Sequence, residues 1–366
     1  MLYAAGGLMN KEKDCITRRY NIWKPGEYYY KMAYGFVPNL VSYQHTDERD
    51  RPCMIVVPGG GYRAVAPTEG EIVALEFWRR GYNAFVLTYT TNFLYNAPLH
   101  KQALEDISRA VRFIRRNRDE FHIVNDQVIL CGFSAGAHLC GSLGVHYADV
   151  VDRNVEYQTV SNRPDTIVLC YPVITATGRY GHEESFDALI GFEPSGETVR
   201  GAERTAVNAA LEYADIAEYK DEAEYFSLEK HVSKTTPPCF IWQTVTDDDV
   251  PVENSILFAK ALRKNGVKFA MHLFSSGKHG LSLANEQWKN GECSEAYTLE
   301  QAFLLADKVK SGEITDIHIP LSEVDGFCTD RKNFVRRMTR DGVCNKEVAI
   351  WPKLADEFIY CLVSPR

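Results

Sequence analysis

The sequence DQVILCGFSAGAH at residues 126–138 joins an apolar run directly to the pattern Gly-x-Ser-x-Gly. A stretch of helical spacing follows at 136–148, so the segment predicts a strand, a sharp turn and a helix. Small residues flank the serine in such a turn because its backbone is strained and neighbouring elements approach closely, which leaves the hydroxyl exposed at the end of the strand. Ser134 is therefore a candidate nucleophile, and the alternative is a glycine-rich helix start without a catalytic role.

Similar apolar runs recur along the chain and alternate with stretches of helical spacing. The other strand candidates are 53–57, 83–89, 165–173, 239–245 and 268–274, and the helix candidates are 69–80, 98–117, 136–148 and 252–265. Continuous apolar runs are typical of strands buried on both faces, so this order predicts an α/β fold with a mostly parallel central sheet flanked by helices. The aromatic segment 16–46 is expected to add antiparallel strands, with an exposed sugar-stacking platform as the alternative.

Two segments interrupt this alternation. We expect one domain over residues 1–366, with a lid-like insertion at 174–236 and a second insertion at 292–345 before a closing helix at 347–363. The first insertion contains a window of helical spacing at 202–219. Insertions between regular units are where such folds place lids and binding walls.

Composition and charge exclude several classes of function. Acidic residues outnumber basic ones by 49 to 41, so no overall positive field favours nucleic acid as a partner. The basic segment 109–118 has helical spacing, and we expect its arginines to form the solvent-exposed face of an amphipathic helix. No stretch reaches the roughly 18 apolar residues of a membrane span, and the first nine residues lack the features of a signal peptide.

The cysteines and histidines give no sign of a metal site. The ten cysteines are scattered without a Cys-x-x-Cys pair, so reduced, buried thiols in a cytoplasmic protein are expected. No His-Glu-x-x-His motif or His/Cys cluster occurs, and we expect neither a metal nor a cofactor. The sequence leaves open whether the chain forms a homo-oligomer.

A second glycine-rich turn is expected after the strand candidate 53–57, in Pro58-Gly59-Gly60-Gly61-Tyr62. Glycines let backbone N–H groups approach a ligand closely, as an oxyanion hole requires, and the N–H that follows the nucleophile, that of Ala135, would complete it. The alternative is a dinucleotide fingerprint, Gly59-x-Gly61-x-x-Ala64. Against it, the strand candidate 83–89 ends without the acidic residue that would bind a ribose.

Candidates for a base and its orienting carboxylate follow two later strands. Three consecutive aspartates come after the run 239–245 within TDDDVP (246–251), and His279 comes after the run 268–274 within SSGKHG (275–280). Because parallel strands end at one edge of a sheet, Ser134, one of these aspartates and His279 can converge there.

With these motifs the sequence resembles the α/β-hydrolase esterases related to acetylxylan esterases, which deacetylate plant polysaccharide fragments. The resemblance spans about 52–291 and 347–363 and rests on VVPGGGY (56–62), EGEIVALEFWRRGYNAFVLTY (69–89), GFSAGAHL (132–139), TPPCFIWQT (236–244), DDDVPVENSILFAKAL (247–262), KHGLSLA (278–284) and VAIWPKLADEF (348–358). It implies the α/β-hydrolase fold. The family's Asp-x-x-Val-Pro pattern implies Asp247 as the triad acid, with Ser134 as nucleophile and His279 as base. Gly60, Gly61 and Ala135 are implied as oxyanion donors.

The sequence departs from this family in three places. A Tyr-Arg pair that is often found there is Tyr89-Thr90 in this chain, a residue that is frequently His is Gln243, and the insertion 292–345 has no counterpart. Two further histidines remain. His138 is expected to pack structurally on the first helical turn after Ser134, and His182 in the first insertion is a candidate substrate contact.

These observations predict a serine carboxylesterase that hydrolyses acetyl esters on acetylated xylo-oligosaccharides or related plant carbohydrates. The expected partner is a small-molecule or oligosaccharide ester, with no nucleic acid and no membrane. The alternatives with the same triad are a prolyl-oligopeptidase-like peptidase and a general short-chain, lipid or aryl esterase. An alternative from another class is a noncatalytic binding protein of the same fold.

Overall fold

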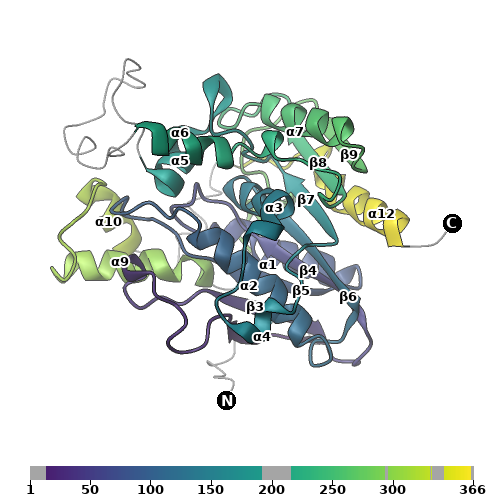
Figure 1. Cartoon of the computed structure of the whole chain (residues 1–366), viewed down its shortest axis with the longest axis horizontal. Helices are drawn as coiled ribbons and strands as arrows, with labels where there is room; N and C mark the ends of the chain where they lie inside the picture. Colours follow the sequence, from purple (N-terminus) through teal and green to yellow (C-terminus); the bar gives the residue numbers. More distant parts are fainter. Residues whose placement is uncertain (1–13, 192–215, 293–295, 330, 332–341, 364–366) are drawn as a thin grey trace.

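The apolar runs form the strands of a central sheet in the computed structural model (Figure 1), which describes residues 14–191, 216–292, 296–329, 331 and 342–363. Its strands are β1 (Cys15–Ile16), β2 (Arg19–Asn21), β3 (Asn39–His45), β4 (Arg51–Val57), β5 (Asn83–Thr88), β6 (Ile123–Phe133), β7 (Thr166–Cys170), β8 (Cys239–Thr244) and β9 (Phe269–Phe274). Their order is β1-β3-β5-β4-β6-β7-β8-β9, and β2 also pairs with β3. Strands β4 to β9 run parallel and β3 is antiparallel to β5. The predicted mostly parallel α/β sheet is confirmed.

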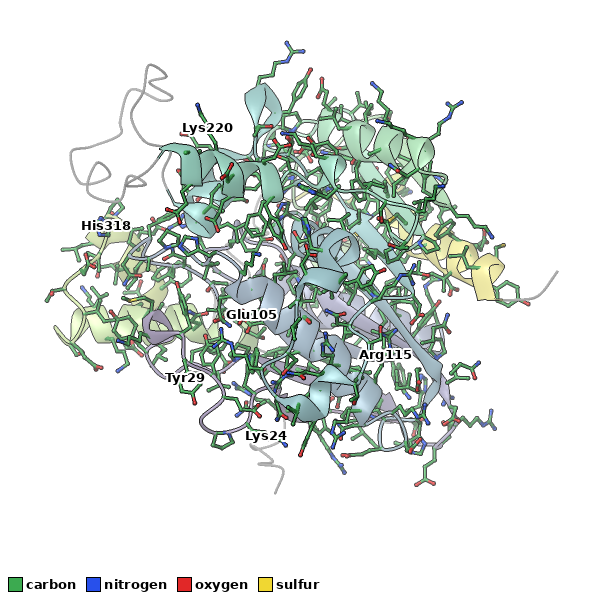
Figure 2. The ribbon with its side chains drawn as sticks, viewed as in Figure 1. Lys24, Tyr29, Glu105, Arg115, Lys220 and His318 are labelled. Carbon is green, nitrogen blue, oxygen red and sulfur yellow. The ribbon has the colours of Figure 1, made fainter. Side chains whose placement is uncertain are left out.

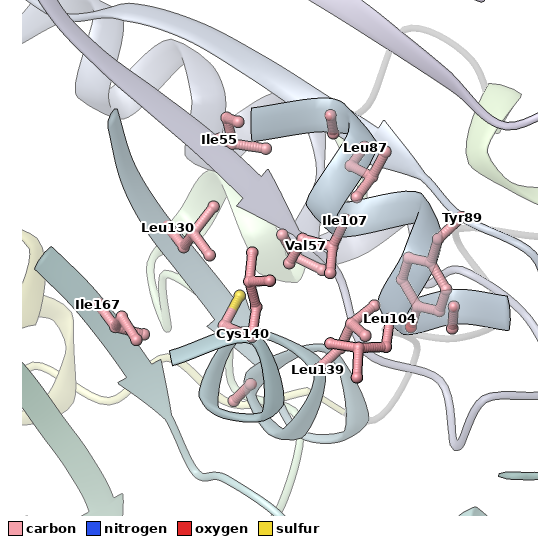
Figure 3. Packing of buried hydrophobic residues seen from close by; sticks show 14 of the residues in the cluster. Ile55, Val57, Leu87, Tyr89, Leu104, Ile107, Leu130, Leu139, Cys140 and Ile167 are labelled. Carbon is pink, nitrogen blue, oxygen red and sulfur yellow. The ribbon is translucent and has the colours of Figure 1, made fainter. Parts of the chain in front are cut away.

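Helices cover both faces of this sheet. Helices α2 (Gln102–Arg116), α3 (Ala135–His146) and α7 (Glu253–Lys264) pack on one face, and α1 (Glu71–Arg79) and α12 (Trp351–Val363) pack on the other. In Figure 3, Val57 of β4 lies beside Ile107 of α2. Ile55 and Val57 belong to the core on this face, whereas their neighbours Met54 and Val56 belong to the core of the opposite face. Successive side chains of a strand face opposite ways, so a strand covered on both sides is apolar throughout.

The segments that interrupt the alternation contain short helices. Between β7 and β8 lie η4 (Gly178–Tyr180), α5 (Glu183–Ile190), α6 (Ile216–Tyr225) and η6 (Leu228–Lys230), and most of the predicted helix at 202–219 falls outside the described residues. After β9 come α8 (Glu286–Lys289), η7 (Tyr297–Leu299), α9 (Glu300–Lys310), α10 (Leu321–Cys328) and η9 (Val348–Ile350). Helices α9 and α10 form a small apolar cluster with Phe93 and Leu94, which follow β5. The division into one domain with two insertions stays a prediction.

The aromatic segment 16–46 is only partly extended. Strands β2 and β3 form the predicted antiparallel pair, but no strand lies between residues 22 and 38. Instead, the Trp23 indole is buried and donates a hydrogen bond to Asp106 at 2.9 Å, and the Tyr28 hydroxyl bonds to that of Thr90 at 2.8 Å. Tyr29 points outward (Figure 2). Most of these aromatic rings thus anchor a loop to the core.

The expectation of a solvent-exposed arginine face on α2 is wrong for its first two arginines. Arg109 is fully buried, where it donates to Asp152 and to Glu27, each at 2.6 Å. Arg112 is also buried and donates to the carbonyl oxygens of Tyr157 and Val150. Helical spacing does not show these partners, because they come from segments remote in sequence.

The cysteine pattern fits the expectation of unpaired thiols in the described part of the chain. Five of the free cysteines are buried, namely Cys53, Cys131, Cys140, Cys170 and Cys239. The expectation of buried thiols is wrong for Cys361, which is exposed, and Cys15, Cys328 and Cys344 are only half-buried. Among the described helices, none is both long and apolar enough to cross a membrane.

Candidate active site

Ser134 lies in a tight turn between the end of β6 and the start of α3. Its backbone has φ +51° and ψ −119°, a conformation that costs energy for a residue with a side chain. A Cβ atom on Gly132 would lie 2.4 Å from the carbonyl oxygen of Gly136, and one on Gly136 would lie 2.2 Å from that of Val57. Both glycines of the motif are therefore required by close backbone approach, as the sequence predicted.

The structure brings Ser134, His279 and Asp247 into one hydrogen-bonded series. His279 Nε2 lies 2.8 Å from Ser134 Oγ. On the other side of the ring, His279 Nδ1 lies 2.9 Å from Asp247 Oδ2 and 3.1 Å from Oδ1. The three residues follow β6, β8 and β9, whose parallel arrangement brings their ends to one edge of the sheet. A base between a hydroxyl and a buried carboxylate is the geometry that activates a serine.

The three consecutive aspartates have different partners. Asp247 faces the His279 ring and also accepts the backbone N–H of Val250 at 2.9 Å. Asp248 accepts the backbone N–H of His279 at 3.1 Å, and Asp249 lies 3.2 Å from Nε2 of His182. Only Asp247 is placed to orient the imidazole.

Gln243, one of the positions at which the sequence departs from the family that it resembles, contacts that aspartate. Its amide nitrogen lies 3.3 Å from Asp247 Oδ2 and 2.7 Å from the carbonyl oxygen of Val250. The hydroxyl of Ser255 donates to its amide oxygen at 2.6 Å. The departure from the family pattern thus leaves the aspartate with a hydrogen-bond donor.

The glycine turn after β4 lies against Ser134. A Cβ atom on Gly59 would be 2.9 Å from the Cβ of Ser134. The N–H of Gly59 donates to Glu69 at 2.7 Å, whereas those of Gly60, Gly61 and Ala135 have no acceptor in the described part of the chain. Gly60 and Gly61 have φ of +114° and +62°, which glycine adopts at little cost.

The dinucleotide alternative for this turn is wrong. That fingerprint requires the glycine turn to open a helix directly, so that the helix N-terminus faces the phosphates. In this chain the next α-helix, α1, begins only at Glu71, after the 3-10 helix η2 (Pro67–Glu69).

A cavity of about 1000 Å³ opens in front of Ser134 and His279. Both interrupting segments line it, the first with His182 and Glu184 and the second with Glu323 and Phe327. Arg63 lies between them and forms ion pairs with Glu184, at 2.7 Å, and with Glu323. Charged side chains from both interrupting segments thus contribute to a cavity wall that also contains apolar residues such as Phe327.

The two remaining histidines differ in their surroundings. His138 is fully buried, and its ring nitrogens bond to the Tyr62 hydroxyl at 2.7 Å and the Phe226 carbonyl oxygen at 2.9 Å. Burial lowers the pKa of His138 to about 4, so it is neutral and structural, as expected. His182 lines the cavity, and its Nδ1 bonds to the Ser185 hydroxyl at 2.8 Å.

The ionisation of His279 follows from opposing effects. Burial lowers its pKa, but the hydrogen bond to Asp247 and the negative charges of Asp247, Asp249 and Glu69 together raise the pKa above its usual value. The imidazolium is therefore stabilised at this position.

Two residues lie at the site although no sequence motif indicates a role for them there. Glu69 and Tyr171 are buried behind the glycine turn, where the Tyr171 hydroxyl donates to Glu69 at 2.7 Å. In the sequence, Glu69 is the first residue of the helix candidate 69–80, and Tyr171 is part of the strand candidate 165–173. Among the described residues, no group of three His, Cys, Asp or Glu side chains could hold a metal ion.

Comparison with known proteins shows that this chain matches one family model and is similar to several relatives. The BD-FAE family model matches residues 41–262. The chain is 50% identical over 288 residues to endo-1,4-beta-xylanase B of Butyrivibrio fibrisolvens, covering 79% of this chain and 41% of that protein. It is 26% identical over 237 residues to acetylxylan esterase of Xylanibacter ruminicola, covering 63% of this chain and 41% of that protein. The chain thus spans about two fifths of the length of these relatives.

Solved structures share the fold. An acetyl ester-xyloside bifunctional hydrolase from Caldicellulosiruptor lactoaceticus superposes with a TM-score of 0.61 at 35% identity, covering 81% of this chain and 96% of that one. The carboxylesterase Cest-2923 from Lactobacillus plantarum superposes with a TM-score of 0.59 at 22% identity, covering 96% and 99%. The second similarity concerns the fold alone.

Proposed function

Since the chain belongs to the BD-FAE family of α/β hydrolases and is a carboxylic ester hydrolase, we propose that it removes acetyl groups from acetylated xylo-oligosaccharides or related plant carbohydrates. The observation that carries this proposal is the series of contacts from Asp247 through His279 to Ser134 beside a glycine turn with free N–H groups. We assign Ser134 as nucleophile, His279 as base and Asp247 as the orienting acid.

In the proposed reaction, Ser134 Oγ attacks the acetyl carbonyl carbon while His279 Nε2 takes the serine proton. The negative charge that develops on the carbonyl oxygen is bound by N–H groups of the glycine turn and of Ala135. The bond between the carbonyl carbon and the sugar oxygen then breaks, His279 gives its proton to that oxygen to form the free sugar hydroxyl, and an acetylated serine remains. A water molecule, deprotonated by His279, attacks the acetyl carbon; the bond to Ser134 Oγ breaks, Oγ takes the proton back from His279, and acetate is released. Asp247 holds the Nδ1–H of the ring throughout and stabilises its positive charge.

Two observations support a carbohydrate as the alcohol part of the substrate. The similar proteins named above include an acetylxylan esterase and an acetyl ester-xyloside hydrolase. In addition, Arg63, Glu184, Glu323, His182 and Asp249 line the cavity. Such side chains donate and accept hydrogen bonds, which suits a ligand rich in hydroxyl groups.

The pH dependence of turnover is expected to reflect His279. Only the neutral imidazole accepts the serine proton, so kcat/KM should fall as the pH drops below the pKa of His279. Because Asp247, Asp249 and Glu69 raise this pKa, the acidic limb should have a midpoint above about 6.5. Initial rates on p-nitrophenyl acetate between pH 4.5 and 9 measure this midpoint, and a rate that stays flat down to about pH 4.5 would exclude a histidine base.

The acyl preference separates an acetylesterase from the alternatives. An enzyme that binds its substrate through the sugar needs room only for a methyl group, so each further methylene must find space or clash. We expect kcat/KM on p-nitrophenyl esters to fall at least about tenfold from acetate to butyrate. Acetylated xylo-oligosaccharides should release acetate, and peptidyl-proline amides should remain uncut. A lipid esterase would instead gain up to about 0.8 kcal/mol per buried methylene, so a maximum at hexanoate or octanoate would contradict the carbohydrate assignment.

A further inference from the structure

Glu69 is a buried carboxyl group that the proposed reaction does not use. It ends η2 and lies behind the glycine turn, where its Oε2 accepts the N–H of Gly59 at 2.7 Å. Its Oε1 accepts the hydroxyl of Tyr171 at 2.7 Å. Burial raises the pKa of Glu69, against the two hydrogen bonds and the charge of His279, which lower it. Burying a carboxyl group is costly, and an apolar side chain would fill the same space without that cost.

Tyr171, which donates its hydroxyl hydrogen to Glu69, also lies close to the segments that carry Ser134 and His279. It directly follows Cys170, whose carbonyl oxygen accepts the N–H of Ser134 at 3.0 Å. Its hydroxyl oxygen accepts the N–H of Ser282 at 3.1 Å, three residues beyond His279. Its ring also meets the His279 ring edge-on, with 4.9 Å between the ring centroids.

The hydrogen bond from the Gly59 N–H to Glu69 also determines the orientation of the glycine turn. With its N–H directed at Glu69, Gly59 is unable to serve the oxyanion, which leaves the N–H groups of Gly60 and Gly61 for that role. Hydrogen-bond donors stabilise an oxyanion only when they are held where the charge develops. A small shift of this turn would therefore slow the reaction without changing how the ground state binds.

We propose that Glu69 and Tyr171 are a positioning pair, which holds the glycine turn and the His279 loop in register with Ser134. Glu69 fixes the turn through Gly59, and Tyr171 fixes the loop through Ser282 and its contact with the His279 ring. Neither side chain takes part in a bond change. The inference rests on the proposed esterase function.

The test compares Glu69→Gln and Tyr171→Phe with the wild-type chain on p-nitrophenyl acetate. A glutamine has one oxygen and one NH₂ group where the carboxylate has two acceptors, so it is unable to accept both the Gly59 N–H and the Tyr171 O–H in the present geometry. We expect kcat to fall about 10- to 100-fold in Glu69→Gln and about tenfold in Tyr171→Phe, with KM changed less than about threefold. Phenylalanine keeps the ring beside His279, so this variant tests the hydroxyl alone.

A pH profile separates the effect of the Glu69 charge on His279 from the effect of the hydrogen bonds that position the turn and the loop. The charges that raise the pKa of His279 are Asp247, Asp249 and Glu69, and Glu69→Gln leaves the first two in place. The acidic limb of kcat/KM should therefore move to lower pH in Glu69→Gln and stay unchanged in Tyr171→Phe.

Asp106→Asn is the matched control. Asp106 is also fully buried, and it accepts a backbone N–H at 2.9 Å and a hydroxyl at 2.5 Å, both from Thr90. Its burial raises its pKa to about 7, yet none of its partners belongs to the site. Asp106→Asn should lower thermal stability and leave kcat within about twofold of wild type.

The outcomes separate the two proposals. A wild-type chain that hydrolyses no acetyl ester overturns the proposed function. An active wild type with unchanged kcat in both Glu69→Gln and Tyr171→Phe overturns the positioning pair alone, as does an equal loss of kcat in Asp106→Asn. If Glu69→Gln does not fold, Tyr171→Phe decides: a kcat within about twofold of wild type contradicts the inference.

Discussion

Ser134→Ala is expected to abolish turnover of acetyl esters. The hydroxyl is the atom that attacks in the proposed reaction, and its loss leaves only the oxyanion donors and substrate binding, which amounts to a decrease in kcat of about 10⁶-fold. Folding should be little affected, because Ser134 Oγ bonds to His279 at the edge of the cavity and contributes little packing. Steady-state rates on p-nitrophenyl acetate and on acetylated xylo-oligosaccharides measure the effect.

An organophosphonate probe provides the corresponding direct evidence. It should label the wild-type chain on Ser134 and leave Ser134→Ala unlabelled. The free energies of unfolding of the two proteins should differ by less than about 1 kcal/mol. If Ser134→Ala retains more than about a hundredth of the wild-type kcat, Ser134 is not the nucleophile. A wild-type chain that neither reacts with the probe nor releases acetate would favour the noncatalytic alternative.

Asp247→Asn is expected to lower kcat by roughly 10³- to 10⁴-fold. The carboxylate accepts the Nδ1–H of His279 at 2.9 Å, which leaves Nε2 unprotonated and able to take the serine proton. An asparagine can present its NH₂ group to Nδ1 and so stabilise the tautomer that carries its proton on Nε2. The lost negative charge should also lower the pKa of His279, so the residual activity should have its acidic limb at lower pH.

The neighbouring aspartates serve as matched controls. Asp248 contacts the backbone N–H of His279, and Asp249 contacts His182 in the cavity wall. The imidazole Nδ1 bonds to Asp247 and Nε2 to Ser134, and neither bonds to these carboxylates. Asp248→Asn and Asp249→Asn should therefore each cost less than about tenfold in kcat. A larger loss in Asp249→Asn than in Asp247→Asn would show that the assignment of the triad acid is wrong.

The sequence alone did not show several side-chain contacts, and these join residues that are far apart in the chain. Arg109 was expected at the surface, but Glu27 and Asp152, 82 and 43 residues away, provide its buried ion pairs. Glu69 and Tyr171 are 102 residues apart, and Arg63 is paired with Glu323, which is 260 residues away. Periodicity describes one element at a time, so it does not reveal a side chain that meets its partner only after the elements have packed.

The sequence by itself determined the strands, the helices that alternate with them, the turn at Ser134 and the edge of the sheet where His279 and the aspartates lie. These features depend on local rules: a strand covered on both faces is apolar throughout, and a turn as tight as that at Ser134 requires glycine at Gly132 and Gly136. The order of parallel strands then brings their ends together. The residues alone left the choice among the three aspartates open, and only the family resemblance implied Asp247, Gly60 and Gly61. The tertiary structure shows that Asp247 faces the imidazole, that the N–H groups of Gly60 and Gly61 have no acceptor in the described part of the chain, and which side chains line the cavity. Each of these depends on direct contacts between segments that are far apart in the chain and meet only after the elements have packed.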